Sequence, residues 1–328
     1  MAGNKKEREH FMRIHKSLAF TVAVSAALSG FAASASAAEP AACGTVRFSD
    51  VGWTDITATT ATASVLLKAL GYQTDIKVLS VPVTYSSLKN KDIDVFLGNW
   101  MPTQEADVRP FLTEKSVESF GPNLTGAKYT LATNAKGAEL GIKDFKDIAA
   151  HADALGGKIY GIEPGNDGNR LILGMIEKDT FGLKKLEVVE SSEQGMLAQV
   201  ARADKAGDPV VFLGWEPHPM NANFKLTYLT GGDDVFGPNF GGAEVYTNVR
   251  SGFTEECPNV GTFIKNLKFS LPMENEIMGG ILNDAEEPEV AATDWLKANG
   301  AAIEPWLAGV TTKDGKPGLD AVKAELGL

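Results

Sequence analysis

Three of the five tryptophans stand beside apolar strings that have the character of buried strands: Trp53 in "VGWTDI", Trp100 in "VFLGNWMP" and Trp215 in "FLGWEPHP". The last two stretches echo each other, more than a hundred residues apart. A tryptophan at the end of a strand needs a partner, which can be the protein core or a ligand. The remaining two, Trp295 and Trp306, lie in apolar helical contexts and are expected to be core residues.

Several aromatic rings that converge on one place suit two kinds of ligand. A sugar stacks on ring faces but needs many polar side chains around its rim, and the neighbouring stretches offer few, namely Asp55, Asn166 and Asp167. A quaternary ammonium has no N–H group to satisfy and is held by cation–π attraction to the ring faces. The residues therefore favour a quaternary ammonium over a sugar, with packing between loops as the structural alternative.

The elements that would position these rings form two copies of one layout. In both, strand and helix alternate as βαβαβ, the unit of a parallel sheet. The first copy has strands at 45–50, 75–81 and 94–98 and helices at 56–71 and 84–92. The second has strands at 158–164, 186–191 and 209–214 and helices at 169–180 and 192–207. The echoed tryptophans follow the third strand of each copy.

Ligands of open α/β sheets bind beyond the carboxyl ends of the strands. Trp100 and Trp215 lie at such ends, and the first strands lead into Trp53 in one copy and Asn166 in the other. Two of these edges facing each other would form a cleft between two lobes. The stretch 120–134 is expected to be the first crossover, which brings Tyr129 near the hinge, and 226–238 the return; the rest, mostly helical, completes the first lobe.

The N-terminus has the pattern of a secretory signal peptide. A basic segment, a short apolar run and the small-residue stretch "SASAAEP" predict cleavage after Ala37. The apolar run is short for a membrane anchor, and no later run approaches the roughly 20 residues that span a bilayer. Removing residues 1–37 changes the net charge from −11 to −14, which argues against a nucleic-acid partner.

The two cysteines, Cys43 and Cys257, are expected to form a disulfide in an oxidising, exported compartment. A lipid-anchored Cys43 is the alternative, and Glu39 and Pro40, which separate it from the apolar run, disfavour it. Two cysteines without clustered histidines do not suggest a zinc site. No metal or other cofactor is implied.

The motifs "VGWTDI", "VFLGNWMP", "AKYTLATN", "EPGNDGNR" and "FLGWEPHPMN" together resemble those of the substrate-binding proteins of glycine betaine and choline ABC importers. The resemblance covers essentially the whole mature chain. It implies a two-lobed periplasmic binding protein fold of type II, with 38–127 plus 230–328 as one lobe and 128–229 as the other. It further implies an aromatic box of Trp53, Trp100, Tyr129 and Trp215 around a trimethylammonium, with Asp55 and Asn166 at the hydroxyl end.

The box cannot separate choline from glycine betaine, because both carry a trimethylammonium. A betaine carboxylate would need basic or N–H donors, whereas a choline hydroxyl can bind Asp and Asn, and an ionised Asp55 would repel a carboxylate. Arg170, the basic residue nearest to these motifs, is expected to be structural or solvent-facing. The sequence therefore predicts choline, with glycine betaine or another quaternary ammonium as the alternative.

Other functional classes have weaker support. The chain contains no H-E-x-x-H, G-x-S-x-G or phosphate-binding glycine motif. His218 lies near the predicted cleft but has no evident nucleophile beside it, so an enzyme acting on choline esters is disfavoured. The expectation is a periplasmic monomer that hands its ligand to an inner-membrane permease; a receptor or adhesion module without a transporter is the other alternative.

Overall fold

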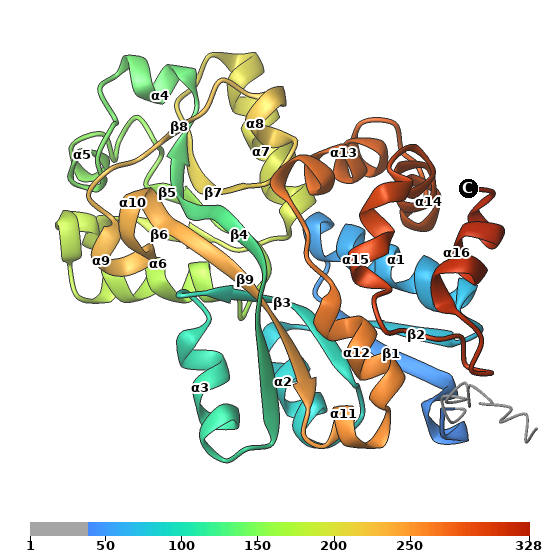
Figure 1. Ribbon diagram of the computed structural model, residues 1–328. Helices are drawn as coiled ribbons and strands as arrows, with labels where there is room; N and C mark the ends of the chain where they lie inside the picture. The colour runs from blue at the N-terminus through green and yellow to red at the C-terminus, as the bar shows by residue number, and fades with distance from the viewer. Residues whose placement is uncertain (1–38) are drawn as a thin grey trace, which may run out of the picture. The chain divides into compact units, whose positions relative to one another are not determined.

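The computed structural model describes residues 39–328, so the predicted signal peptide lies outside the described residues. Within this range nine strands form one mixed sheet with the order β2-β1-β3-β9-β4-β7-β5-β6, and β8 pairs with β4. Helices pack around this sheet (Figure 1). The α/β fold class predicted from the sequence is confirmed.

The first predicted βαβαβ unit is present. Strands β1 (Thr45–Asp50), β2 (Gln73–Val78) and β3 (Val95–Met101) are linked by α1 (Thr54–Ala69) and α2 (Val81–Lys89). Strand β1 lies in the middle and pairs in parallel with both neighbours. Helix α1 ends just before Gly71, whose φ of +89° is a conformation that a side chain would disfavour. We call these elements the β1 half of the molecule.

The second unit repeats this arrangement. Strands β5 (Lys158–Tyr160), β6 (Glu187–Val189) and β7 (Val211–Glu216) are linked by α6 (Asp167–Glu177) and α7 (Glu193–Ala206). Strand β5 again lies between the other two and is parallel to both. We call these elements the β5 half. The matched strand orders explain the echoed stretches, because each belongs to the third strand of its unit.

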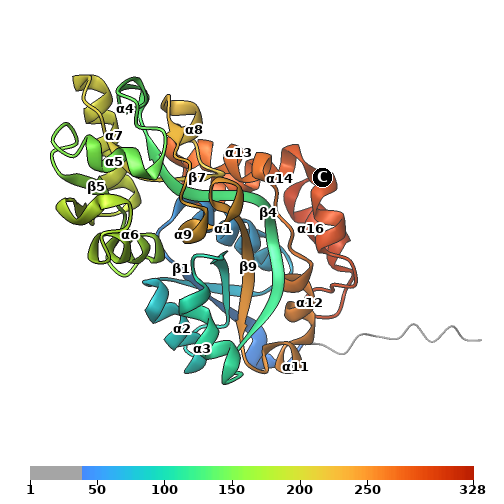
Figure 2. The ribbon, with the colours of Figure 1, turned by 90° about the vertical axis from the view of Figure 1, so that its left-hand side faces the viewer.

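The first crossover is a strand rather than a loop. Strand β4 (Val117–Thr133) pairs antiparallel with β9 (Gly242–Arg250) along its first part and with β7 from Lys128 onward. Figure 2 shows β4 and β9 side by side as they run between the two halves. The return path holds β8 (Thr227–Tyr228), α9 (Asp233–Phe236) and α10 (Pro238–Gly241). Tyr129, expected near the hinge, lies on β4 just beyond the change of partner.

The C-terminal part is helical, as predicted, and packs on the β1 half. Helix α1 contacts α13, α14 and α16 in addition to the sheet, so its residues are buried on several faces.

Among residues 39–328, no helix combines the length and the apolar character that a bilayer span requires. The other α-helices are α3 (Glu105–Thr113), α4 (Ala135–Glu139), α5 (Phe145–Ala150), α8 (Met220–Asn223), α11 (Phe253–Glu256), α12 (Pro258–Asn266), α13 (Leu271–Leu282), α14 (Pro288–Ala298), α15 (Ile303–Trp306) and α16 (Gly318–Leu326), and the 3-10 helices are η1 (Ala41–Gly44), η2 (Thr180–Lys185) and η3 (Gly300–Ala302).

The predicted disulfide is confirmed. Cys43 in η1 is bonded to Cys257, which lies between α11 and α12, with the two Cα atoms 5.7 Å apart. Both cysteines are buried. The bond joins the segment before β1 to the segment after β9, at the end of the β1 half where β1 begins.

Candidate functional site

The four aromatic residues singled out in the sequence come together. Trp100 and Trp215 are the penultimate residues of β3 and β7, and Tyr129 on β4 is the register partner of Trp215. The ring centroids of Trp100 and Tyr129 lie 6.0 Å apart, and those of Tyr129 and Trp215 lie 6.2 Å apart. Trp53 precedes the first residue of α1. Each of the four side chains is at most 5% exposed, so all four rings are enclosed.

The N–H groups of two of these tryptophans are donated to carboxylates. Trp100 Nε1 donates to Asp55 Oδ2 at 3.0 Å, and Trp53 Nε1 donates to Glu163 Oε1 at 3.0 Å. Asp55 is in the β1 half, in the first turn of α1, whereas Glu163 follows β5 in the other half. Each bond fixes the plane of an indole, and the second one does so across the two halves.

Asn166 is held by the helix that it begins. It is the N-cap of α6, and its Oδ1 accepts from the backbone N–H groups of Gly168 and Asn169 at 2.8 and 3.2 Å. The same oxygen accepts the Tyr129 hydroxyl at 2.9 Å. Because three donors already occupy Oδ1, a further partner can bind only the Nδ2 group of Asn166, which also donates to Asp167 Oδ1 at 3.5 Å.

These side chains surround one small cavity of about 20 Å³, far below the roughly 300–1,000 Å³ typical of pockets for drug-sized ligands. None of its lining residues is basic. The lining consists of Trp53, Asp55, Trp100, Tyr129, Ile162, Asn166, Asp167 and Trp215. All six residues predicted for the site are therefore at one cavity, together with Ile162 and Asp167.

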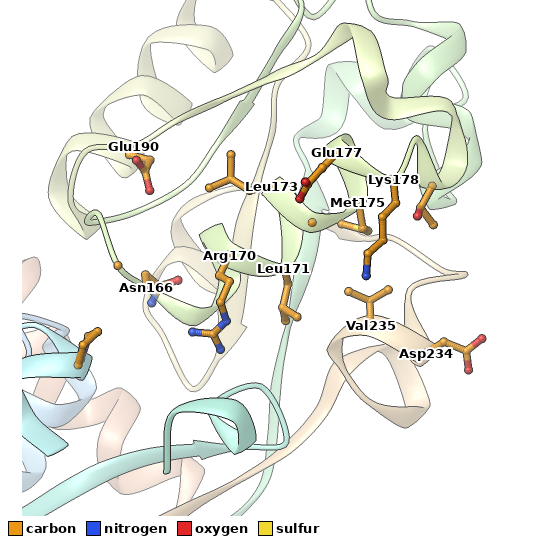
Figure 3. A pocket seen from close by; sticks show the side chains of 14 residues that line it. Asn166, Arg170, Leu171, Leu173, Met175, Glu177, Lys178, Glu190, Asp234 and Val235 are labelled. Carbon is orange, nitrogen blue, oxygen red and sulfur yellow. The ribbon is translucent and has the colours of Figure 1, made fainter. Parts of the chain in front are cut away.

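A wider groove of about 800 Å³ lies beside this cavity and is open to solvent. Figure 3 shows it along α6, with Arg170 and Leu171 projecting from that helix and Val235 on α9 opposite. Asn166 lines both hollows. Since the groove lacks the aromatic rings, the enclosed cavity is the candidate site.

The acids at the cavity are held in an environment that favours their neutral forms. Burial raises the pKa of the Asp55 carboxyl to about 8, and the negative charge of Glu193 adds to this rise. Burial likewise raises the pKa of Glu163 to about 7 and that of Asp167 to about 6. Asp55 Oδ1 and Asp167 Oδ2 are buried without a hydrogen-bond partner. Such oxygens are stabilised by a proton or by a cation placed beside them.

Arg170 is not part of the cavity. Its two terminal nitrogens bind both carboxylate oxygens of Asp107 on α3, at 2.7 and 2.8 Å. The guanidinium therefore links α6 in the β5 half to α3, beside the groove that Arg170 also lines. This agrees with the structural role expected for Arg170, and the residues that line the cavity include no arginine.

His218, considered as a possible base, does not line the cavity. It is 1% exposed, its Nδ1 accepts the Met220 N–H at 2.9 Å, and its Nε2 lies 3.3 Å from Glu193 Oε1. Glu193 and Glu163 were both missed in the sequence. Glu163 is the penultimate residue of the strand predicted at 158–164, and Glu193 comes two residues after the strand predicted at 186–191. The rule that ligands lie at strand ends could therefore have pointed to both.

The family model described as the substrate binding domain of an ABC-type glycine betaine transport system matches residues 44–298. This span includes all the residues of the cavity. The chain belongs to this family. Its members are substrate-binding proteins of transporters and not enzymes, so the chain is the substrate-binding protein of an ABC transporter, as predicted.

Individual relatives support the same assignment. A solved ABC-transporter choline binding protein in complex with choline is 78% identical, covers 88% of this chain and 100% of its own, and superposes with a TM-score of 0.87. A choline binding protein in an unliganded semi-closed conformation, with the same identity and coverage, has a TM-score of 0.81. The glycine betaine/carnitine transport binding protein GbuC of Listeria monocytogenes is 32% identical over 125 residues, which are 38% of this chain and 40% of that protein.

The membership fixes the general setting of the protein. Substrate-binding proteins of ABC importers work outside the cytoplasmic membrane, either in the periplasm or at the cell exterior, and pass their ligand to a membrane permease. The two-lobed fold that the motifs implied is the fold of these neighbours.

Proposed function

We propose that this protein binds choline in the aromatic cavity and delivers it to the permease of an ABC importer. The observation that carries the proposal is the composition of the cavity: four ring systems and two acids with unpaired buried oxygens, without any basic group. Such a cavity suits a small cation that has no N–H groups. The 78% identical neighbour bound to choline supports the same ligand.

The two ends of choline would meet different partners. The faces of Trp53, Trp100, Tyr129 and Trp215 attract the trimethylammonium, with each desolvated contact worth about 0.5–2 kcal/mol. The hydroxyl donates to the unpaired Oδ1 of Asp55 and accepts from Nδ2 of Asn166, which can donate a second N–H besides the one directed at Asp167 Oδ1. A bound cation also favours the ionised form of Asp55, whose pKa burial raises to about 8.

Glycine betaine is the second candidate, because the family model and the Listeria relative are named for it. Its carboxylate would have to lie near Asp55 and Asp167, with no arginine or lysine in the cavity lining. The lining therefore offers no cationic partner for the carboxylate, and each acid that is ionised repels it, which is specificity by repulsion. We therefore place choline first.

We further propose lobes of 38–127 plus 230–328 and of 128–229, which close on the ligand as a monomer in the periplasm after removal of residues 1–37. The change of β4 from β9 to β7 at Lys128 supports the first boundary. Closure would bring Trp53 against Glu163 and Arg170 against Asp107. The higher TM-score to the choline complex than to the semi-closed form agrees with a closed arrangement.

Calorimetric titration of the mature protein with choline, glycine betaine and a panel of sugars tests the proposal. We expect choline to bind with a Kd in the micromolar range or below, which corresponds to about 8 kcal/mol or more, and betaine to bind much more weakly. If betaine binds more tightly than choline, glycine betaine becomes the assigned ligand in place of choline. If no quaternary ammonium binds, the rings belong to the core or serve another ligand.

Replacing Asp55 with asparagine should change the affinities for choline and glycine betaine in different ways. Asp55→Asn removes the negative charge near the ammonium and the acceptor for the hydroxyl, and hydrogen bonds to charged groups contribute about 1.5–3 kcal/mol. We expect choline affinity to fall about 10- to 100-fold, and betaine affinity to hold or rise. Asp75→Asn, on the half-exposed side chain of β2, is the matched control. Unchanged affinities for both ligands would remove Asp55 from the site.

A further inference from the structure

Glu193 makes a buried contact between the two halves of the molecule. It is the first residue of α7 in the β5 half and is 1% exposed. Its Oε2 accepts the backbone N–H of Thr54 at 2.9 Å, and its Oε1 accepts the Thr54 hydroxyl. Thr54 is the first residue of α1 in the β1 half. A side chain of one half therefore accepts hydrogen bonds from the first residue of a helix in the other half.

A third donor completes the surroundings of this carboxylate. The His218 ring accepts a backbone N–H at Nδ1, so its proton is on Nε2, which lies 3.3 Å from Glu193 Oε1 and donates to it. Burial of a carboxylate is costly unless hydrogen bonds replace its water. The three donors and the positive end of the α1 dipole supply that replacement. Two of the donors come from the opposite half and are lost if the halves separate.

The position of Thr54 gives this contact a consequence for the cavity. Thr54 lies between Trp53 and Asp55, both of which line the cavity. On its other side, Glu193 contacts His218, whose ring centroid lies 5.0 Å from that of Trp215. One carboxylate thus connects the segment that carries Trp53 and Asp55 to the segment that carries Trp215.

We propose that Glu193 is a positioning residue for the ligand site: it locks the Trp53–Asp55 turn against the β5 half and so holds the closed cavity around the ligand. This inference rests on the proposed function. Glu193 touches no ligand, since it is absent from the cavity lining. It acts through Thr54, by making the geometry of Trp53 and Asp55 depend on closure.

The contact forms only in the closed arrangement. Its loss should therefore raise the dissociation rate of the ligand more than it changes the association rate. Differences in affinity between variants of one site arise mostly in the dissociation rate. In Glu193→Ala, the Thr54 N–H and the His218 ring lose their acceptor. Glu193→Gln keeps one acceptor oxygen and loses the charge. We expect the choline dissociation rate to rise about 10-fold or more in Glu193→Ala and by a smaller factor in Glu193→Gln.

Stopped-flow measurement of choline binding, by the intrinsic fluorescence of the cavity tryptophans, tests this expectation in the mature protein. The wild type is measured first, so that a failure of the proposed function is seen before any variant is compared. The association rate is expected to change less than about 3-fold in both variants, while the dissociation rate rises. General destabilisation of the protein would not produce this difference between the two rates. Glu105→Gln, an exposed glutamate in the first turn of α3, is the matched control and should leave both rates unchanged.

Thr54→Val keeps the experiment decisive if Glu193→Ala does not fold. It removes only the hydroxyl that donates to Glu193, and the dissociation rate should rise several-fold. In the double variant Thr54→Val/Glu193→Gln, the dissociation rate should rise by less than the product of the two single fold-changes, because both substitutions remove the same interaction. Unchanged dissociation in Thr54→Val and Glu193→Gln, in a protein that binds choline, overturns the proposal.

Discussion

Replacement of Trp215 with alanine is expected to weaken choline binding by about 2–3 kcal/mol, or roughly 30- to 150-fold. Trp215 lines the cavity and lies directly across from Tyr129 on β4, so its loss opens one wall of the proposed box. A desolvated cation–π contact is worth about 2 kcal/mol or more, and the removed ring also excluded water. Calorimetric titration with choline measures the change.

Two further variants separate loss of the ring from loss of structure. Trp215→Phe keeps an aromatic face with a weaker attraction for cations, and it should bind choline less tightly than the wild type and more tightly than Trp215→Ala. Trp295→Ala removes a partly buried tryptophan that hydrogen-bonds Glu276, outside the cavity, and should leave the affinity unchanged. If Trp215→Ala folds and binds choline as tightly as the wild type, the aromatic box is wrong.

Removal of the disulfide is expected to lower the free energy of unfolding by about 4 kcal/mol. Cys43 and Cys257 are 214 residues apart in sequence, so their bond restricts a long loop in the unfolded chain. The double variant Cys43→Ala/Cys257→Ala should also unfold at a temperature lower by roughly 10 °C. Urea and thermal unfolding of the mature protein, without ligand, measure both changes.

Choline affinity at 25 °C serves as the control for the disulfide variant. The bond lies at the start of β1, whereas the cavity is beyond its carboxyl end, a strand length of about 20 Å away. The affinity should therefore be unchanged while the protein remains folded. A stability within about 1 kcal/mol of the wild type would show that the disulfide contributes little to the native state.

Much of the fold could be predicted because the local pattern is strong. The strand 45–50 was placed with its observed bounds, and the helix expected at 192–207 agrees with α7 to within a residue at each end. Apolar strings of strand length between amphipathic segments leave few other interpretations. The shift of α2 toward its N-terminus, to Val81–Lys89, arises because Pro82 suits the first turn of a helix.

The strand β4 could not be predicted in the same way. Its residues include Gly121, Pro122 and Gly126, which are typical of loops, and irregularities in its pairing with β9 accommodate them. Only the antiparallel partners β9 and β7, distant in sequence, make this segment a strand of 17 residues. Pairing of this kind is a property of the tertiary structure, which overrides local propensity.

The sequence by itself determined the types of side chain that reach the strand ends, and with them the chemistry of the cavity. Trp100 and Trp215 occupy matching positions because both units have the same order of elements, and strand direction alone sends both to one edge. Family motifs then singled out Tyr129, Asp55 and Asn166, which the structure brings to the same cavity.

Only the tertiary structure decided which polar groups form hydrogen bonds with one another. The bonds from Trp53 to Glu163 and from Thr54 to Glu193 join residues separated by 110 and 139 positions. No local pattern marks them, because a buried carboxylate is stable only where donors from distant segments converge on it. The burial that raises the pKa of Asp55 to about 8 likewise exists only once α1, α7 and α13 have packed around it.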